Sequence, residues 1–172
     1  MFMQFCDLER LRNNGAREEL KRLCEHGYIS AEDGARVRIR EIEKFTRSTL
    51  FSEMLSAKKI YRELRFNVRL PASEFTADEE KKLAYKDREI LVQGVIDCII
   101  ERADGSIALY DYKTDRLTRE ELCDPSLAEI KLREKHKMQL ELYSMAVERL
   151  FSKAPEVLAV YSLALGDSVK IR

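Results

Sequence analysis

Two aspartates and a lysine occupy positions where burial makes charge expensive. The stretch GVIDCIIERADGSIALYDYKTDR, residues 94–116, places Asp97 inside one apolar run and both Asp111 and Lys113 at the end of the next. Neighbouring carboxylates raise each other's pKa unless a cation lies between them. Two aspartates, a backbone carbonyl and water form an all-oxygen ligand set that suits Mg²⁺ or Mn²⁺. A lysine beside such an ion can stabilise charge on a metal-bound water or a phosphate, so the pattern predicts phosphodiester hydrolysis.

This chemistry requires Asp97 to face Asp111 across a hairpin. The dipeptide Asp104-Gly105 marks the turn. Side chains alternate along a strand, so a two-residue turn would pair Asp97 with the residue after Asp111 and point the two carboxylates apart. We therefore expect a three-residue loop, residues 103–105, with Gly105 in the left-handed conformation.

A purely structural alternative uses the same residues. Asp111 and Lys113 could form a buried salt bridge, with Asp97 hydrogen-bonded nearby. Carboxylates in unusual environments are concentrated at functional sites, which favours the metal site over this alternative.

The spacing of apolar residues predicts the elements that position these side chains. Helical periodicity covers the ranges 1–14, 15–27, 30–45 and 46–57, with Ser30 as a helix cap and Gly27 as a helix end. Strand-like patterns follow at 60–70, 90–100 and 106–113, the first two separated by a polar stretch, and the second apolar enough to be covered on both faces. Two possible capping boxes, TREE and SLAE, then precede a helix at 127–152, and residues 156–172 read as a strand and the start of a hairpin. The order predicts a mixed α/β domain over 1–172, with a helical segment at 1–57 and an α/β core at 58–172.

Gln139 is an unusual residue on the apolar stripe of the long helix. It shares that stripe with Tyr143, four residues later. A buried amide without a partner costs about 1–3 kcal/mol, so Gln139 needs a hydrogen-bonding partner. That partner is either a group in the predicted site or a backbone carbonyl, in which case Tyr143 is only a packing residue. Just upstream, Lys131–Lys137 is either a phosphate-binding patch or a solvated face.

The segments GVID, YDYKT and QLELY together resemble the RecB-type nucleases of the PD-(D/E)XK superfamily. The similarity is greatest to the C-terminal nuclease domain of the AddA subunit of bacterial AddAB helicase–nucleases. It implies a restriction-endonuclease-like fold, with Asp97, Asp111 and the Tyr112 carbonyl as metal ligands. Lys113 would then assist the attacking water.

The same resemblance assigns further roles. Gln139 and Tyr143 would orient the site or contact DNA, and Glu63 would act behind the ligands or pair with an arginine. These nucleases also use a histidine from an N-terminal helix, but His26 and His136 lie in other contexts. We expect the matching histidine to precede Met1, in a longer parent protein.

The implied activity is that of a Mg²⁺-dependent DNA exonuclease, with Mn²⁺ as a possible substitute, in a cytoplasmic helicase–nuclease that processes double-strand breaks. Its partners would be single strands at duplex ends, the helicase portion of the parent chain and an AddB-type subunit, with no membrane involved. One alternative is a Cas4-like nuclease acting alone, although its cluster-binding cysteines are missing. Another is a non-catalytic module that binds DNA ends.

Composition narrows the remaining classes of function. Basic and acidic residues balance at 31 each, so any nucleic-acid surface must be local rather than a global field. Four scattered cysteines match no metal-ligand spacing and are expected to be reduced. No apolar run approaches the length of a membrane span.

Overall fold

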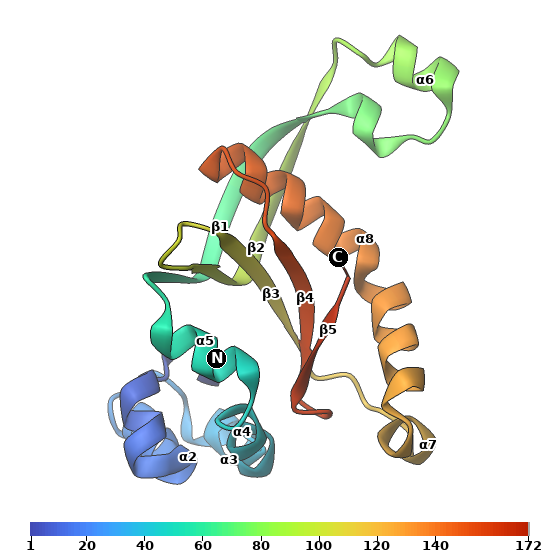
Figure 1. Ribbon diagram of the computed structural model, residues 1–172. Helices are drawn as coiled ribbons and strands as arrows, with labels where there is room; N and C mark the ends of the chain where they lie inside the picture. The colour runs from blue at the N-terminus through green and yellow to red at the C-terminus, as the bar shows by residue number, and fades with distance from the viewer. Residues whose placement is uncertain (172) are drawn as a thin grey trace.

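A computed structural model describes residues 1–171, which form a mixed five-stranded sheet in the order β1-β2-β3-β4-β5 (Figure 1). The strands are β1 (Lys59–Pro71), β2 (Glu89–Glu101), β3 (Ile107–Lys113), β4 (Val157–Ser162) and β5 (Asp167–Lys170). Only β3 and β4 run parallel, and the other neighbouring pairs are antiparallel. The predicted mixed sheet with flanking helices is therefore confirmed.

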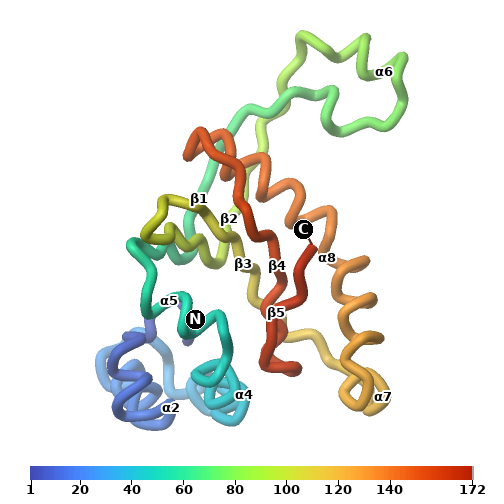
Figure 2. Tube along the Cα trace, viewed as in Figure 1, coloured from blue at the N-terminus to red at the C-terminus, as the bar shows by residue number. Residues whose placement is uncertain are grey.

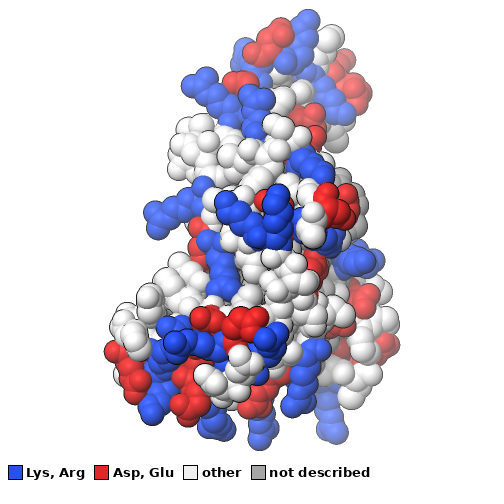
Figure 3. All heavy atoms as spheres, turned by 60° about the vertical axis from the view of Figure 1, so that its left-hand side comes forward, with Lys and Arg blue, Asp and Glu red and all other residues white. Residues whose placement is uncertain are grey.

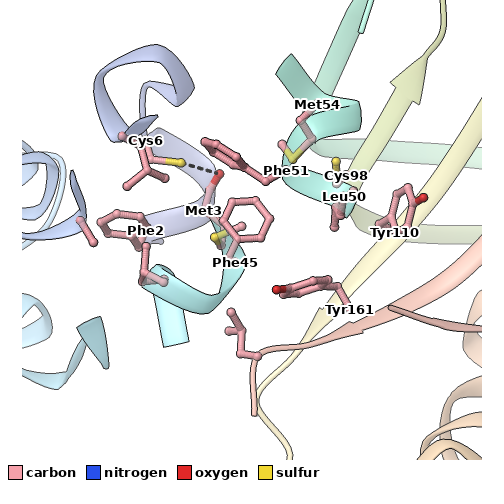
Figure 4. Packing of buried hydrophobic residues seen from close by; sticks show 14 of the residues in the cluster. Phe2, Met3, Cys6, Phe45, Leu50, Phe51, Met54, Cys98, Tyr110 and Tyr161 are labelled. Atoms are coloured by element: carbon pink, nitrogen blue, oxygen red, sulfur yellow. Dashed lines mark hydrogen bonds between the residues drawn. The ribbon is translucent and has the colours of Figure 1, made fainter. Parts of the chain in front are cut away.

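Five N-terminal helices pack against one face of the sheet. They are α1 (Phe2–Phe5), α2 (Leu8–Glu25), α3 (Ala31–Arg36), α4 (Ile39–Phe45) and α5 (Thr49–Ser56). Their buried side chains form one core cluster with Cys98, Tyr110 and Tyr161 of the strands. Phe45 packs edge-on against Tyr161, with ring centroids 5.4 Å apart (Figure 4). The helical segment expected at 1–57 therefore shares one hydrophobic core with the sheet.

The helix expected over 30–45 is wrong in one respect, because it divides into α3 and α4. Ser30 caps α3 as predicted, accepting a hydrogen bond from the Asp33 N–H. Val37 and Arg38 then take extended conformations. Val37 and Ile39 would point in nearly opposite directions on a continuous helix, yet both pack against the core. The break lets both side chains reach it.

The helix expected over 1–14 is also interrupted. Cys6 is extended, and the Asp7 side chain caps α2 by accepting from the Arg10 N–H. Gly15 is non-helical inside α2, with φ of 83°, and the expected helix end at Gly27 is confirmed by its φ of 73° after the last helical residue.

The long helix α8 (Pro125–Phe151) covers the opposite face of the sheet. Leu140, Ala146 and Val147 pack in a second cluster with Leu109 and Val160. The cap predicted at Ser126 is wrong, because Asp124 accepts from the Ser126 N–H and Pro125 takes the first helical position, where it loses no hydrogen bond. The other capping box is confirmed at Thr118 and Glu121, and it starts the short helix α7 (Arg119–Cys123).

Beyond the core, β1 and β2 continue as a long hairpin arm (Figure 2). Its tip holds η1 (Ala72–Phe75) and α6 (Glu79–Ala84) within the stretch expected to be polar. The expectation that β2 is covered on both faces is wrong for its first half, where Leu91 is 59% exposed. The half around Ile96–Ile100 is buried, whereas the first half is covered on one face only, where Val92 packs with Val68 and Leu70 against the cluster that includes α8.

The four cysteines are free thiols at separate places in the fold. Cys6 and Cys98 are buried in the first core cluster, whereas Cys123 is exposed at the end of α7. Within residues 1–171 no helix combines the length and apolar character needed to cross a membrane.

Candidate functional site

The hairpin between β2 and β3 has the three-residue loop that the site requires. The Arg102 N–H donates to the Ser106 carbonyl at 2.9 Å, which closes the loop at residues 103–105. Gly105 has φ of 79°, in the left-handed region that glycine occupies without strain. The predicted loop geometry is confirmed.

The loop sets Asp97 opposite Asp111. Cys98 and Tyr110 form the last pair of the β2–β3 ladder, and Asp97 and Asp111 are the next residues along the two strands. The charge of Asp111 is close enough to Asp97 to raise its pKa. Asp111 is only 2% exposed, at a point where β3 lies between β2 and β4.

Asp97 is the more open of the two carboxyls, and its pKa is perturbed. Burial, reinforced by the neighbouring Asp111 charge, raises the pKa of Asp97 from 3.8 to about 6. The Tyr112 N–H donates to Asp97 Oδ2 at 2.8 Å and opposes the rise by stabilising the ionised form. Burial and charge repulsion therefore outweigh this hydrogen bond.

Lys113 connects Asp111 to helix α8. Its Nζ lies 2.5 Å from Asp111 Oδ2 and donates to Gln139 Oε1 at 2.8 Å. The ion pair, together with the hydrogen bond of Asp97, is the set of contacts that the structural alternative predicts. The additional bond to Gln139 fixes the ammonium from a second element.

Gln139 extends this chain of contacts to Tyr143. Its Nε2 donates to the Tyr143 hydroxyl at 3.0 Å, so both ends of the amide bond side chains. The alternative partner considered for Gln139, a backbone carbonyl, is not the one it takes. Lys113, Gln139 and Tyr143 thus form one connected row, although their catalytic roles remain a proposal.

Gly94, the first residue of the GVID segment, leaves space for the Phe66 ring, which packs against Tyr143 of this row. Gly94 pairs with Phe66 across β1 and β2, and a Cβ at Gly94 would lie 2.7 Å from the Phe66 ring. That ring packs edge-on against Tyr143 at 5.7 Å between centroids. Sequence reasoning missed this packing role, although a glycine inside a strand is a signal of close approach.

Glu63 belongs more closely to the site than the sequence indicated. It lies between the pairs Arg62–Cys98 and Leu64–Ile96, and therefore across from Asp97. Its φ of 51° is left-handed and unusual for a non-glycine residue. Its charge contributes to the raised pKa of Asp97.

The alternative role weighed for Glu63, an ion pair with an arginine, does not occur among residues 1–171. The imperfect two-residue alternation in 60–70 was the available signal for the irregular backbone at Glu63.

The donor set fits a hard divalent cation. Asp97 and Asp111 are neighbouring carboxyls, and Asp97 has no ion-pair partner within residues 1–171. In the same residues, no three His, Cys, Asp or Glu side chains form a group that could hold a metal ion. The two aspartates would leave coordination positions to water, which suits Mg²⁺ because it keeps several waters.

The two histidines lie away from the aspartate pair. His26 Nδ1 contacts the Arg22 carbonyl on the exposed end of α2. His136 is buried on α8, where its Nε2 lies 3.0 Å from Asp115 Oδ2. The His136–Asp115 contact ties the segment after β3 to the helix that carries Gln139.

The chain is similar to known nucleases over nearly its whole length. The profile of the PD-(D/E)XK nuclease superfamily matches residues 3–168. The chain belongs to this superfamily. Within the matched range, Asp111-Tyr112-Lys113 has the form of the Asp-X-Lys element in the superfamily's name.

Two relatives of this PD-(D/E)XK chain share one description, the A subunit of an ATP-dependent helicase/nuclease. The relative from Clostridium botulinum (strain 657 / Type Ba4) is 32% identical over 172 residues, or 99% of this chain and 13% of that protein. The relative from Thermoanaerobacter sp. (strain X514) is 35% identical over 168 residues, or 97% of this chain and 13% of that protein. The chain therefore spans about 13% of the length of these relatives.

Proposed function

We propose that this chain is a metal-dependent DNA nuclease that hydrolyses phosphodiester bonds. Asp97, Asp111 and the Tyr112 carbonyl would hold Mg²⁺, with Mn²⁺ as a possible substitute. The observation that carries the proposal is the adjacent pair of carboxyls, of which Asp111 is buried and paired with Lys113, while Asp97 has a pKa raised to about 6. An ion between them would relieve the repulsion that this arrangement creates.

The side chains divide the chemistry in a specific way. When bound, a divalent cation polarises the scissile phosphate and lowers the pKa of a water at its site. Lys113 is held between Asp111 and Gln139, where its fixed ammonium can stabilise negative charge that develops on the phosphate. Tyr143 keeps the Gln139 amide oriented, with its oxygen toward Lys113.

The two relatives support a proposal about the larger protein to which this chain belongs. Both are called helicase/nuclease subunits, and we propose that residues 1–172 are one nuclease domain of such a protein. In that setting it would act as an exonuclease on single strands that a helicase portion delivers from double-strand breaks. An AddB-type subunit in the cytoplasm would be its partner in recombinational repair.

Loss of a labelled single-stranded oligonucleotide, with Mg²⁺ or Mn²⁺, tests the activity. We expect Asp111→Asn to abolish cleavage while the exposed Asp87→Asn leaves it unchanged. In an intact helicase–nuclease, Asp111→Ala should remove cleavage and leave unwinding in place. Cleavage that survives Asp111→Asn would refute the assignment of this residue.

The Asp111–Lys113 ion pair also favours a second candidate function, a DNA-end-binding module without catalysis. That candidate predicts metal-independent binding of the oligonucleotide and no cleavage with either ion. The same assay therefore separates the two functions.

A further inference from the structure

A cavity of about 500 Å³ opens beside Asp97. The sheet contributes Glu63, Asp97 and Tyr112 to its lining, the turn between α3 and α4 contributes Arg36 and Arg38, and residues Met1–Met3 line it as well. Its volume is in the range of small-ligand pockets and suits nucleotides of a single strand. The two guanidinium groups therefore share one cavity with Asp97, one of the two carboxyls proposed to hold the ion.

The turn that carries the arginines is anchored in the core. Arg36 ends α3 and Arg38 precedes α4, with extended Val37 between them. Val37 and Ile39 both pack against the first core cluster. Burial of these two apolar residues fixes the backbone, so both arginines project from a defined position.

Both guanidinium groups are exposed, and that of Arg36 is only weakly engaged. The Arg36 side chain is 71% exposed and lies 2.6 Å from Glu32, which is itself 78% exposed. Solvent-exposed ion pairs contribute about 0–1 kcal/mol, so a phosphate can displace this pair at little cost. The Arg38 side chain is 55% exposed and lies 2.6 Å from Glu41, which is 18% exposed and also lines the cavity, so Arg38 is held in place while its exposed part faces the cavity. Arginine also binds phosphate oxygens in a two-pronged manner that lysine does not reproduce.

The lysines at the start of α8 lie elsewhere on the surface. Lys131 and Lys135 pair with the largely buried carboxyls of Glu121 and Asp115, whereas Lys137 makes an exposed contact of 3.8 Å with Glu141. None of the three lysines lines the cavity over Asp97 among the residues described. Elsewhere on the surface, basic and acidic side chains are interspersed (Figure 3), so no extended basic surface replaces the cavity arginines on the face shown.

We propose that Arg36 and Arg38 bind the backbone phosphates of single-stranded DNA next to the scissile bond and hold the strand against the aspartate pair. This inference rests on the proposed nuclease function and assigns its substrate contacts. A strand in the cavity would then be held by an ion bound next to Asp97 and by the two arginines. The arginines contribute to strand binding rather than to the bond-breaking step.

The test measures KM and kcat for cleavage of a labelled oligothymidylate with Mn²⁺, together with binding by fluorescence anisotropy at several salt concentrations. The variants are Arg36→Ala, Arg38→Ala and the double substitution. Arg12→Ala is the matched control, because Arg12 is an exposed arginine that pairs with Glu9 three residues away, as Arg38 pairs with Glu41. Thermal melting verifies that each variant is folded.

For the double variant we expect KM and the dissociation constant to rise about tenfold, with kcat within about twofold of the unsubstituted chain. The salt dependence of log K should weaken by about 0.7 for each lost phosphate contact. Unchanged affinity and salt dependence in the double variant, or an equal loss in Arg12→Ala, would overturn the inference. If the unsubstituted chain still cleaves the oligonucleotide in that case, the proposed nuclease function stands. If the unsubstituted chain neither binds nor cleaves the oligonucleotide, both proposals fail.

Discussion

Replacing Asp97 by asparagine should change how the stability of the metal-free protein depends on pH. The unfolded chain releases the Asp97 proton near pH 3.8, whereas the folded chain holds it until about pH 6. Between these values the folded state binds more protons, so the free energy of unfolding falls as the pH rises. This loss of stability is absent below the pKa of Asp97 in the unfolded chain and complete above its pKa in the folded chain. Asparagine has no proton to release, and its curve should lack this fall.

The size of the effect follows from the pKa of the folded state. The difference between 3.8 and about 6 corresponds to at most about 3 kcal/mol in the free energy of unfolding. Solvent screening of the partly open carboxyl reduces the expected value to about 1–2 kcal/mol. Asp97→Asn should therefore gain about that much stability over the unsubstituted chain as the pH rises from about 4 to about 7.

Urea denaturation in the presence of a chelator measures this difference. The exposed Asp87→Asn variant is the control and should follow the curve of the unsubstituted chain. In the unsubstituted chain, saturating Mg²⁺ or Mn²⁺ should cancel the fall of the free energy of unfolding with pH, because the ion favours the ionised carboxyl. The same ions should have little effect on the stability of Asp97→Asn. Parallel pH curves for Asp97→Asn and the unsubstituted chain would refute the reasoning that burial and Asp111 raise this pKa.

Three further substitutions test the row of contacts behind the aspartates. Lys113→Ala should destabilise the metal-free protein by about 3–5 kcal/mol, because buried Asp111 loses its cation. Millimolar Mn²⁺ should restore the melting temperature of this variant, while its cleavage stays about 10²–10³-fold slower. An unfolded variant that metal does not rescue, or a fully active one, would contradict the proposed role. Gln139→Ala should slow cleavage about 10–100-fold by freeing the ammonium, and an unchanged kcat would count against it. Gly94→Ala should cost about 1–3 kcal/mol in urea denaturation, because its Cβ displaces the Phe66 ring, whereas equal stability would show that the ring moves freely.

Local patterns in the sequence were sufficient for the parts of the site that depend on neighbouring residues. The Asp-Gly dipeptide and the alternation of strand side chains predicted the three-residue loop, and Gly105 adopts the expected left-handed conformation. Asp97 and Asp111 consequently follow the last ladder pair, Cys98–Tyr110, on neighbouring strands, where the charge of Asp111 acts on Asp97. The periodicity of the long helix likewise placed Gln139 and Tyr143 on one stripe, where they hydrogen-bond each other.

Other features were beyond local patterns because they depend on packing between distant segments. The break at Val37 follows from two apolar side chains reaching the same core, and that core includes strands more than sixty residues later in the chain. The position of Glu63 across from Asp97 depends on the register of β1 against β2. No local pattern predicted that the α3–α4 turn shares a cavity with Asp97.

The sequence by itself therefore determined which carboxyls are neighbours on adjacent strands. Carboxylate repulsion, strand alternation and the turn residue are properties of short segments and can be read without the fold. Only the tertiary structure decided what surrounds the aspartates: the Lys113–Gln139 bond across to α8, the Phe66 ring over Gly94, and the two arginines across the cavity. These contacts join segments far apart in the chain, and their geometry is fixed by burial of the two core clusters on opposite faces of one sheet.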